Sequence, residues 1–172
     1  GFGSAARFEQ ILLLPVLGLN TAIISIIGQN FGAKNFIRVQ ESYFTAVKYG
    51  FILMIISGSI IFLSADKIVG IFSDNPVVIS YGTTYLKISA LIFPAYPIFF
   101  ISNGFFMAIK KSKNSMYLNV IRNIILPIPT ILAANAIDGS FETFFWCYCF
   151  ANWFYVLCLF AYVRNYIKKK IL

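Results

Sequence analysis

Histidine is absent from this 172-residue chain, and acidic residues are scarce, with six Asp and Glu against 14 Lys and Arg. The absence of histidine removes the most common metal ligand and the most common general base. The three cysteines, Cys147, Cys149 and Cys158, share one apolar run and lack the further ligands that a zinc site requires. We therefore expect packing cysteines, no metal site, no cofactor and no enzymatic function.

Charged residues of both signs are also few, at 12% of the chain, whereas soluble domains contain roughly 25%. Hydrophobic residues make up 59%, which leaves too little polar surface to keep such a chain in water. The fold class predicted is all-α, a polytopic bundle of transmembrane helices surrounded by membrane lipids. The net charge of +8 lies in short clusters between apolar runs, so membrane topology explains it better than a nucleic-acid partner does.

Uncharged runs mark the spans. They cover residues 10–33, 49–65, 88–109 and 143–163, and a helix needs about 20 residues to cross the hydrocarbon core. A fifth run, 114–137, contains one charge, Arg122, which can snorkel or pair. We predict a single membrane domain over 1–172 with five spans, at about 5–30, 44–65, 84–109, 114–137 and 143–164. The polar segments between them are predicted connections, at Lys34–Ser42, Asp66–Tyr81, Lys110–Asn114 and Asp138–Glu142.

The basic residues are unevenly divided between the two sides that five spans define. One side has Lys34, Arg38, Lys110, Lys111, Lys113, Arg164, Lys168, Lys169 and Lys170, with Lys48 at its edge. The other has only Arg7, Lys67 and Lys87, together with most of the acids, Glu9, Asp66, Asp74, Asp138 and Glu142. The positive-inside rule makes the first side cytoplasmic, so we expect a plasma or inner membrane protein with a cytoplasmic C-terminus.

Polar residues within the spans are the candidate functional residues, because lipid offers them no partner and they must face other helices or water. The candidates for the lining of a substrate cavity are Asn20, Ser25, Gln29, Ser102, Asn103, Asn119, Arg122 and Asn152. Interhelical hydrogen bonding is the alternative role for each of them. Gly28 and Gly32 have the small-xxx-small spacing that permits close helix packing. Pro94 and Pro97 predict a bend in the third span.

Several strings of the chain resemble the multidrug and toxic compound extrusion (MATE) family. They are Arg7-Phe8-Glu9-Gln10, Leu14-Pro15, Gly18-Leu19, Gly28-Gln29-Asn30-Phe31-Gly32-Ala33-Lys34, Phe72-Ser73-Asp74 with Tyr85-Leu86, and Arg122 with Ile125 and Pro127. The resemblance covers nearly the whole chain. It implies helices eight to twelve of a twelve-helix, two-bundle transporter. The start at Gly1 agrees with the expectation that the N-terminal bundle of the same protein is missing.

The resemblance also implies a function. Members of the family export drugs and other amphiphilic organic compounds in exchange for protons or sodium. One branch uses an acid in its tenth helix for coupling, but residues 88–109 contain no acid here. The chain therefore is more similar to the DNA-damage-inducible (DinF-like) branch, whose coupling acid lies in the first helix. Among the acids of this chain, Glu9 alone is kept open as a candidate coupling acid.

The resemblance predicts a secondary active, cation-coupled antiporter that works by alternating access. The alternative is a flippase of related fold for lipid-linked oligosaccharides or polysaccharides. Such a cavity needs several inward-facing Arg or Lys residues, and Arg122 is the one candidate in the spans. A membrane-embedded enzyme is a third class, which needs paired acids or a nucleophile with a base in the spans.

Overall fold

The chain folds into long helices. The computed structural model describes residues 2–72 and 75–171, without the side chains of 2–9, 12, 72 and 170. Arg7 and Glu9 therefore lie outside the described side chains, and Ser73 and Asp74 lie outside the described residues. The elements in order are α1 (Phe2–Gly32), α2 (Phe36–Phe72), α3 (Pro76–Ile92), α4 (Ala95–Ala108), α5 (Ser112–Val120), a π-helix (Ile121–Ile125), α6 (Pro127–Ile137) and α7 (Phe141–Lys170).

The described residues contain helices and no strands, which confirms the predicted all-α fold class. Four helical stretches are long and apolar enough to cross a membrane: 13–32, 36–71, 112–137 and 141–169. Helices α3 and α4 form a fifth span when they are taken together as one broken span, bent by 51°. The predicted bend at Pro94 and Pro97 is therefore present, because α3 ends at Ile92 and α4 begins at Ala95.

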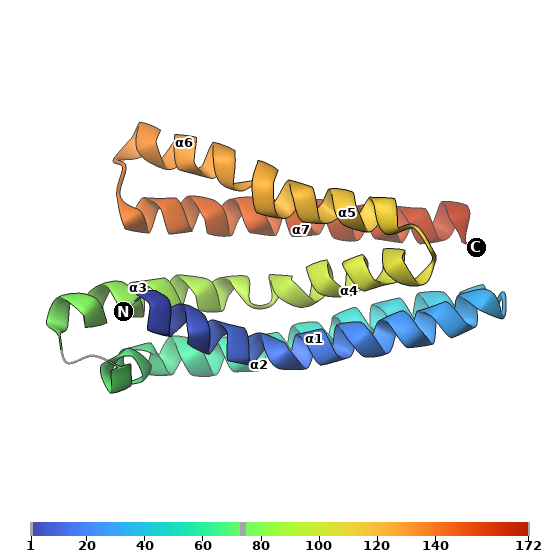
Figure 1. Cartoon of the computed structure of the whole chain (residues 1–172), viewed down its shortest axis with the longest axis horizontal. Coiled ribbons are helices and arrows are strands. Elements are labelled where there is room, and N and C mark those ends of the chain that lie inside the picture. The colour runs from blue at the N-terminus through green and yellow to red at the C-terminus, as the bar shows by residue number, and fades with distance from the viewer. Residues whose placement is uncertain (1, 73–74, 172) are drawn as a thin grey trace.

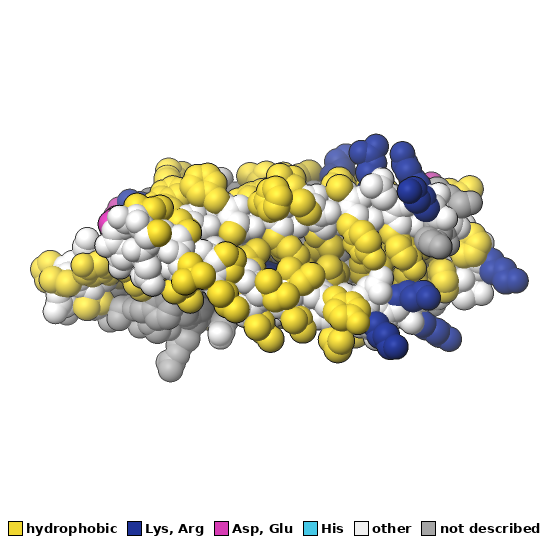
Figure 2. Space-filling model, turned by 90° about the horizontal axis from the view of Figure 1, so that it is seen from above, with side chains coloured by type: hydrophobic (Ala, Val, Ile, Leu, Met, Phe, Trp, Pro, Cys, Tyr) yellow, Lys and Arg dark blue, Asp and Glu magenta, His cyan; other side chains and the backbone are white. Residues whose placement is uncertain are grey.

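The helices run side by side, with α3 and α4 in the middle of the bundle (Figure 1). The α1–α2 and α4–α5 connections and the C-terminus lie at one end, and the α2–α3 and α6–α7 connections lie at the other. The Lys and Arg side chains gather at the end that carries the C-terminus (Figure 2). The fold thus places the basic segments of the sequence together at one end of the bundle.

Helix ends lie closer to one another than the predicted polar connections suggested. Helix α2 continues through Asp66 to Phe72, and α3 already begins at Pro76, so the predicted connection over 66–81 is wrong. Three ends use left-handed backbone: Lys34 and Lys110 have φ values of 57° and 61°, and Gly139 has 65°. Such residues satisfy the last carbonyls of a helix, which allows an abrupt turn.

The turn before α7 is built from side-chain caps. The Ser140 hydroxyl accepts a hydrogen bond from the Thr143 backbone N–H at 3.2 Å and so caps α7. The Ser140 backbone N–H donates to the Asp138 carboxylate at 2.9 Å. That bond holds the pKa of the exposed Asp138 below its usual value. Asp138 is therefore a turn residue and stays ionised near neutral pH.

Glycines bring α3 and α4 close to the first two helices. A Cβ at Gly58 of α2 would lie 2.8 Å from the Ala90 carbonyl oxygen of α3. A Cβ at Gly50 would lie 2.9 Å from the Cβ of Pro97, and one at Gly104 would collide with the side chain of Asn20. Because these positions have no side chain, the broken central span packs directly against α1 and α2.

Candidate functional site

Arg122 occupies the π-helix in the middle of the fourth span. Pro127 begins α6 and has no N–H to donate, and its ring disfavours the regular i→i−4 pattern just before it. The Leu126 N–H instead donates to the Ile121 carbonyl, five residues back, at 2.8 Å. The extra residue in this turn is typical of π-bulges, which are frequent at functional sites. The π-helix, Ile121–Ile125, contains Arg122 itself.

The Arg122 side chain is only 7% exposed and lies over aromatic rings of α4. Its guanidinium carbon is 4.1 Å from the ring centre of Phe99, 4.9 Å from that of Tyr96 and 5.8 Å from that of Phe100. Cation–π contacts of this kind are worth about 2 kcal/mol when desolvated. They replace part of the hydration that the cation loses in the bundle.

The expected burial of Arg122 is present, and its pairing with polar groups or carbonyls stays a prediction. Its Nε is buried and has no hydrogen-bond partner among the described residues. The sequence did not predict the aromatic contacts, because the ring faces come from another helix, and no spacing in the sequence connects Arg122 to Phe99. Arg122 is thus a cation held by aromatic faces, with a donor still unused.

A polar connection joins α4 to α5 next to this site. The Ser115 hydroxyl donates to the Asn103 side-chain oxygen, and the Asn119 side-chain amide donates to the Ser115 carbonyl at 2.9 Å. Two predicted site residues, Asn103 and Asn119, are therefore brought together through Ser115, which sequence reasoning missed. The signal was available, since Ser115 and Asn119 are four residues apart and share a helix face.

Helix α1 carries three further predicted site residues, Asn20, Ser25 and Gln29. Ser25 and Gln29 are exposed on α1, and the Gln29 amide donates to the Ser25 hydroxyl at 3.4 Å. Asn20 lies against Gly104 of α4, and its side-chain oxygen is buried without a partner among the described residues. Ser25 and Gln29 thus offer polar groups to whatever covers this face of the segment, whereas Asn20 is directed into the contact with α4.

Two further candidates lie in the interior of the segment. Ser102 is fully buried, and its hydroxyl shares a 2.8 Å hydrogen bond with the Tyr43 hydroxyl of α2. Asn152 of α7 is also fully buried, and neither polar atom of its amide has a partner among the described residues. Ser102 therefore acts as an interhelical hydrogen-bonding residue here, and Asn152 is a polar group without a described partner.

The predicted packing glycines differ in their surroundings. A Cβ at Gly28 would meet the Ala108 carbonyl oxygen at 3.9 Å, an ordinary contact, and one at Gly32 would meet nothing within 4 Å. Their role in close packing stays a prediction. The described residues contain no group of three His, Cys, Asp or Glu side chains that could hold a metal ion.

Apolar spans around a broken central helix define a polytopic helical membrane protein. Comparison with family models identifies it further: the MatE model matches residues 1–132. The chain therefore belongs to the MatE, or multidrug and toxic compound extrusion, family. Among curated relatives, it is 29% identical over 129 residues to the probable multidrug resistance protein YpnP of Bacillus subtilis (strain 168). It is 23% identical over 138 residues to an FAD transporter of Shewanella oneidensis.

These matches cover 75% and 80% of this chain but only 29% and 30% of the relatives. Solved structures agree in fold. A MOP superfamily transporter from Pyrococcus furiosus superposes with a TM-score of 0.90 at 19% identity, over 98% of this chain and 39% of that one. The MATE transporter ClbM in complex with Rb+ superposes with a TM-score of 0.87 at 22% identity, over 93% and 37%. The chain thus spans less than two fifths of these proteins.

Proposed function

We propose that the complete protein is a cation-coupled antiporter that exports drugs or other amphiphilic organic compounds by alternating access. The MatE match over residues 1–132 carries this proposal. The relative described as a probable multidrug resistance protein supports the substrate class. Protons and sodium both stay open as the coupling ion. The matches give no support to the alternative of a lipid-linked oligosaccharide or polysaccharide flippase.

In this proposal, residues 1–172 form the partial C-terminal bundle and supply one wall of the transport cavity. The missing N-terminal bundle of the same protein supplies the other wall. Ser25 and Gln29 are the most accessible of the proposed lining residues, since both are exposed in this segment. Asn103, Asn119 and Arg122 are proposed as a second lining group around the π-helix. The protein is proposed to lie in the plasma membrane with its C-terminus in the cytoplasm.

The test is efflux of a cationic dye from cells or proteoliposomes that contain the full-length protein, under an imposed proton or sodium gradient. We expect one of the two gradients to drive efflux and an ionophore for that ion to stop it. Residues 1–172 expressed alone should not transport, because half of the cavity is absent. If a folded full-length protein moves no dye under either gradient, the proposed function is wrong.

A further inference from the structure

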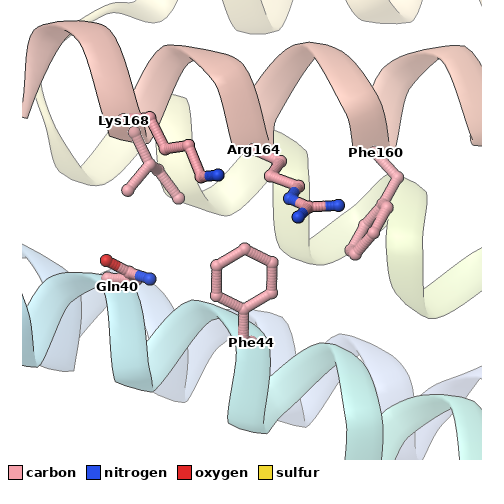
Figure 3. A pocket seen from close by; sticks show the side chains of 6 residues that line it. Gln40, Phe44, Phe160, Arg164 and Lys168 are labelled. Carbon is pink, nitrogen blue, oxygen red and sulfur yellow. The ribbon is translucent and has the colours of Figure 1, made fainter.

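Helices α2 and α7 both pack on the central span, and a groove lies between them. Its wide part has a volume of about 930 Å³ and is lined almost entirely by apolar groups, among them Phe51, Leu91, Trp153 and Leu157. A second hollow of about 310 Å³ lies between the same two helices, nearer the end that carries most of the basic residues (Figure 3). Neither hollow is needed by the transport mechanism proposed above.

The two hollows lie in line along the same pair of helices. Phe44 and Phe51 are two helical turns apart on α2, and Leu157 and Phe160 are one turn apart on α7, so each pair shares a face. Across the groove, the rings of Phe44 and Phe160 lie 5.9 Å apart, and those of Phe51 and Trp153 lie 6.5 Å apart. One ring pair lies in each hollow, so aromatic rings line both the wide part and the narrow part.

The narrow part ends in two cations. Arg164 and Lys168 are one turn apart on α7, and their side chains extend beside Gln40 and Phe44 of α2 (Figure 3). Neither forms an ion pair within the described part of the chain, where the ion pair present is Lys87 with Asp66. The uncharged run of α7 ends at residue 163, so both cations lie where a lipid headgroup region is expected.

We propose that this groove binds one anionic glycerophospholipid. Arg164 and Lys168 would hold its phosphate, and the Gln40 amide would donate a further hydrogen bond. One acyl chain would follow the aromatic rings into the wide apolar part. The charge pattern selects this ligand, because basic pockets between helices near the cytoplasmic surface favour anionic headgroups. A free phosphate would leave the apolar part unused, and a zwitterionic lipid would offset the attraction with its own cation.

The test uses the quenching of tryptophan fluorescence in the delipidated full-length protein. Phosphatidylglycerol brominated on its acyl chains is titrated in detergent, with brominated phosphatidylcholine and inorganic phosphate as the comparison ligands. We expect phosphatidylglycerol to quench at lower concentration than phosphatidylcholine. Trp146→Phe with Trp153→Phe should remove the high-affinity part of the quenching, because both tryptophans line the wide part. Inorganic phosphate should neither quench nor displace the lipid.

The decisive variant is Arg164→Gln with Lys168→Gln. At about 1 kcal/mol for each basic residue near the surface, the half-saturating concentration of phosphatidylglycerol should rise roughly 30-fold. Lys111→Gln with Lys113→Gln removes the same charge from exposed residues outside the groove. This control variant should change the half-saturating concentration of phosphatidylglycerol less than about threefold. Equal quenching by both lipids, an equal loss in the control variant, or displacement by inorganic phosphate would overturn the proposal. So would the absence of quenching in the parent protein, which would mean that another protein segment fills the groove.

Discussion

Arg122 shows how a single cation is accommodated inside an apolar bundle. Its three aromatic neighbours supply electrostatic attraction, and its buried Nε has no hydrogen-bond partner among the residues that the structure describes. The sequence predicted the burial, because an isolated charge in a span must turn away from lipid. It did not predict the partners, because aromatic residues are common throughout the spans and their register against Arg122 depends on the bend between α3 and α4.

We expect Arg122→Leu in the full-length protein to lower folded yield or dye efflux, and Arg122→Lys to restore only part of the loss. A lysine keeps the charge but not the planar face that stacks on Phe99. The loss of the contact should cost about 2 kcal/mol of stability or less, the value of a desolvated cation–π contact. Yield by size-exclusion chromatography and initial efflux rates measure the two quantities. Normal yield with unchanged export in the leucine variant would show that the contact is dispensable.

The central span is an element whose break was predictable and whose packing was not. Pro94 and Pro97 predicted the bend because each lacks a backbone donor. The tight contacts at Gly50, Gly58 and Gly104 carry no comparable signal, since glycine is frequent in membrane helices wherever it packs. The π-helix was missed for a similar reason, because Pro127 indicates a disturbed helix without specifying whether it kinks or bulges.

Gly58 offers a direct test of this packing. We expect Gly58→Ala to lower the free energy of unfolding by about 1–3 kcal/mol, because the added Cβ would press on the Ala90 backbone. Gly70→Ala is the matched control on the same helix, since nothing lies within 4 Å of its Cβ position. Alanine is favoured over glycine in a helix, so the control should be neutral or more stable. Thermal unfolding of the purified full-length protein compares them, and equal melting temperatures would refute the close packing.

Pro94 tests whether the bend contributes to transport. We expect Pro94→Ala to slow dye efflux, because a straighter central span would change the shape of the cavity beside Arg122. Pro97 is less suitable for substitution, since it also packs against Gly50. Pro15→Ala is the control, because Pro15 lies inside the unbroken α1. Efflux kinetics that are unaltered in the Pro94 variant would leave the bend with a packing role alone.

Across the segment, the helices extend beyond the uncharged runs that predict the spans. Charged residues are costly in hydrocarbon, so uncharged runs predict the membrane spans. Helices α2 and α7 nevertheless continue through residues such as Arg38, Asp66 and Arg164, because charged residues outside the hydrocarbon are still compatible with a helix. The polar segments were therefore predicted as connections longer than the structure contains.

The uneven charge gives a testable topology. Single cysteines at Ser112 and Ile137, both exposed and near opposite ends of the fourth span, can be introduced into a cysteine-free full-length protein. An impermeant maleimide added to intact cells should label the cysteine at 137 and leave the one at 112 unlabelled, as the positive-inside rule requires. Ile137 is preferable to Ser140, whose hydroxyl caps α7. The reverse labelling pattern would invert the predicted orientation.

The distribution of acids bears on the source of coupling. An ion-driven exporter needs a titratable or cation-binding group within the membrane, usually a carboxylate. Among the acids whose side chains are described, Glu41, Asp138 and Glu142 are exposed outside or at the ends of the uncharged runs. Asp66 is 68% exposed and already lies 3.5 Å from the Lys87 ammonium. None of these four has the buried setting of a coupling carboxylate.

We therefore predict that the principal coupling carboxylate lies in the N-terminal bundle rather than in residues 1–172. Glu9 is the exception to be tested, because the predicted first span, at about 5–30, includes it, and its side chain lies outside the described residues. Gradient-driven dye efflux by the full-length protein is measured with Glu9→Gln and with each intramembrane acid of the first bundle neutralised in turn. One of the first-bundle changes should abolish efflux at normal expression, and Glu9→Gln should retain it. The prediction is wrong if Glu9→Gln abolishes efflux while every first-bundle change is tolerated, since the ion would then bind in this half of the transporter.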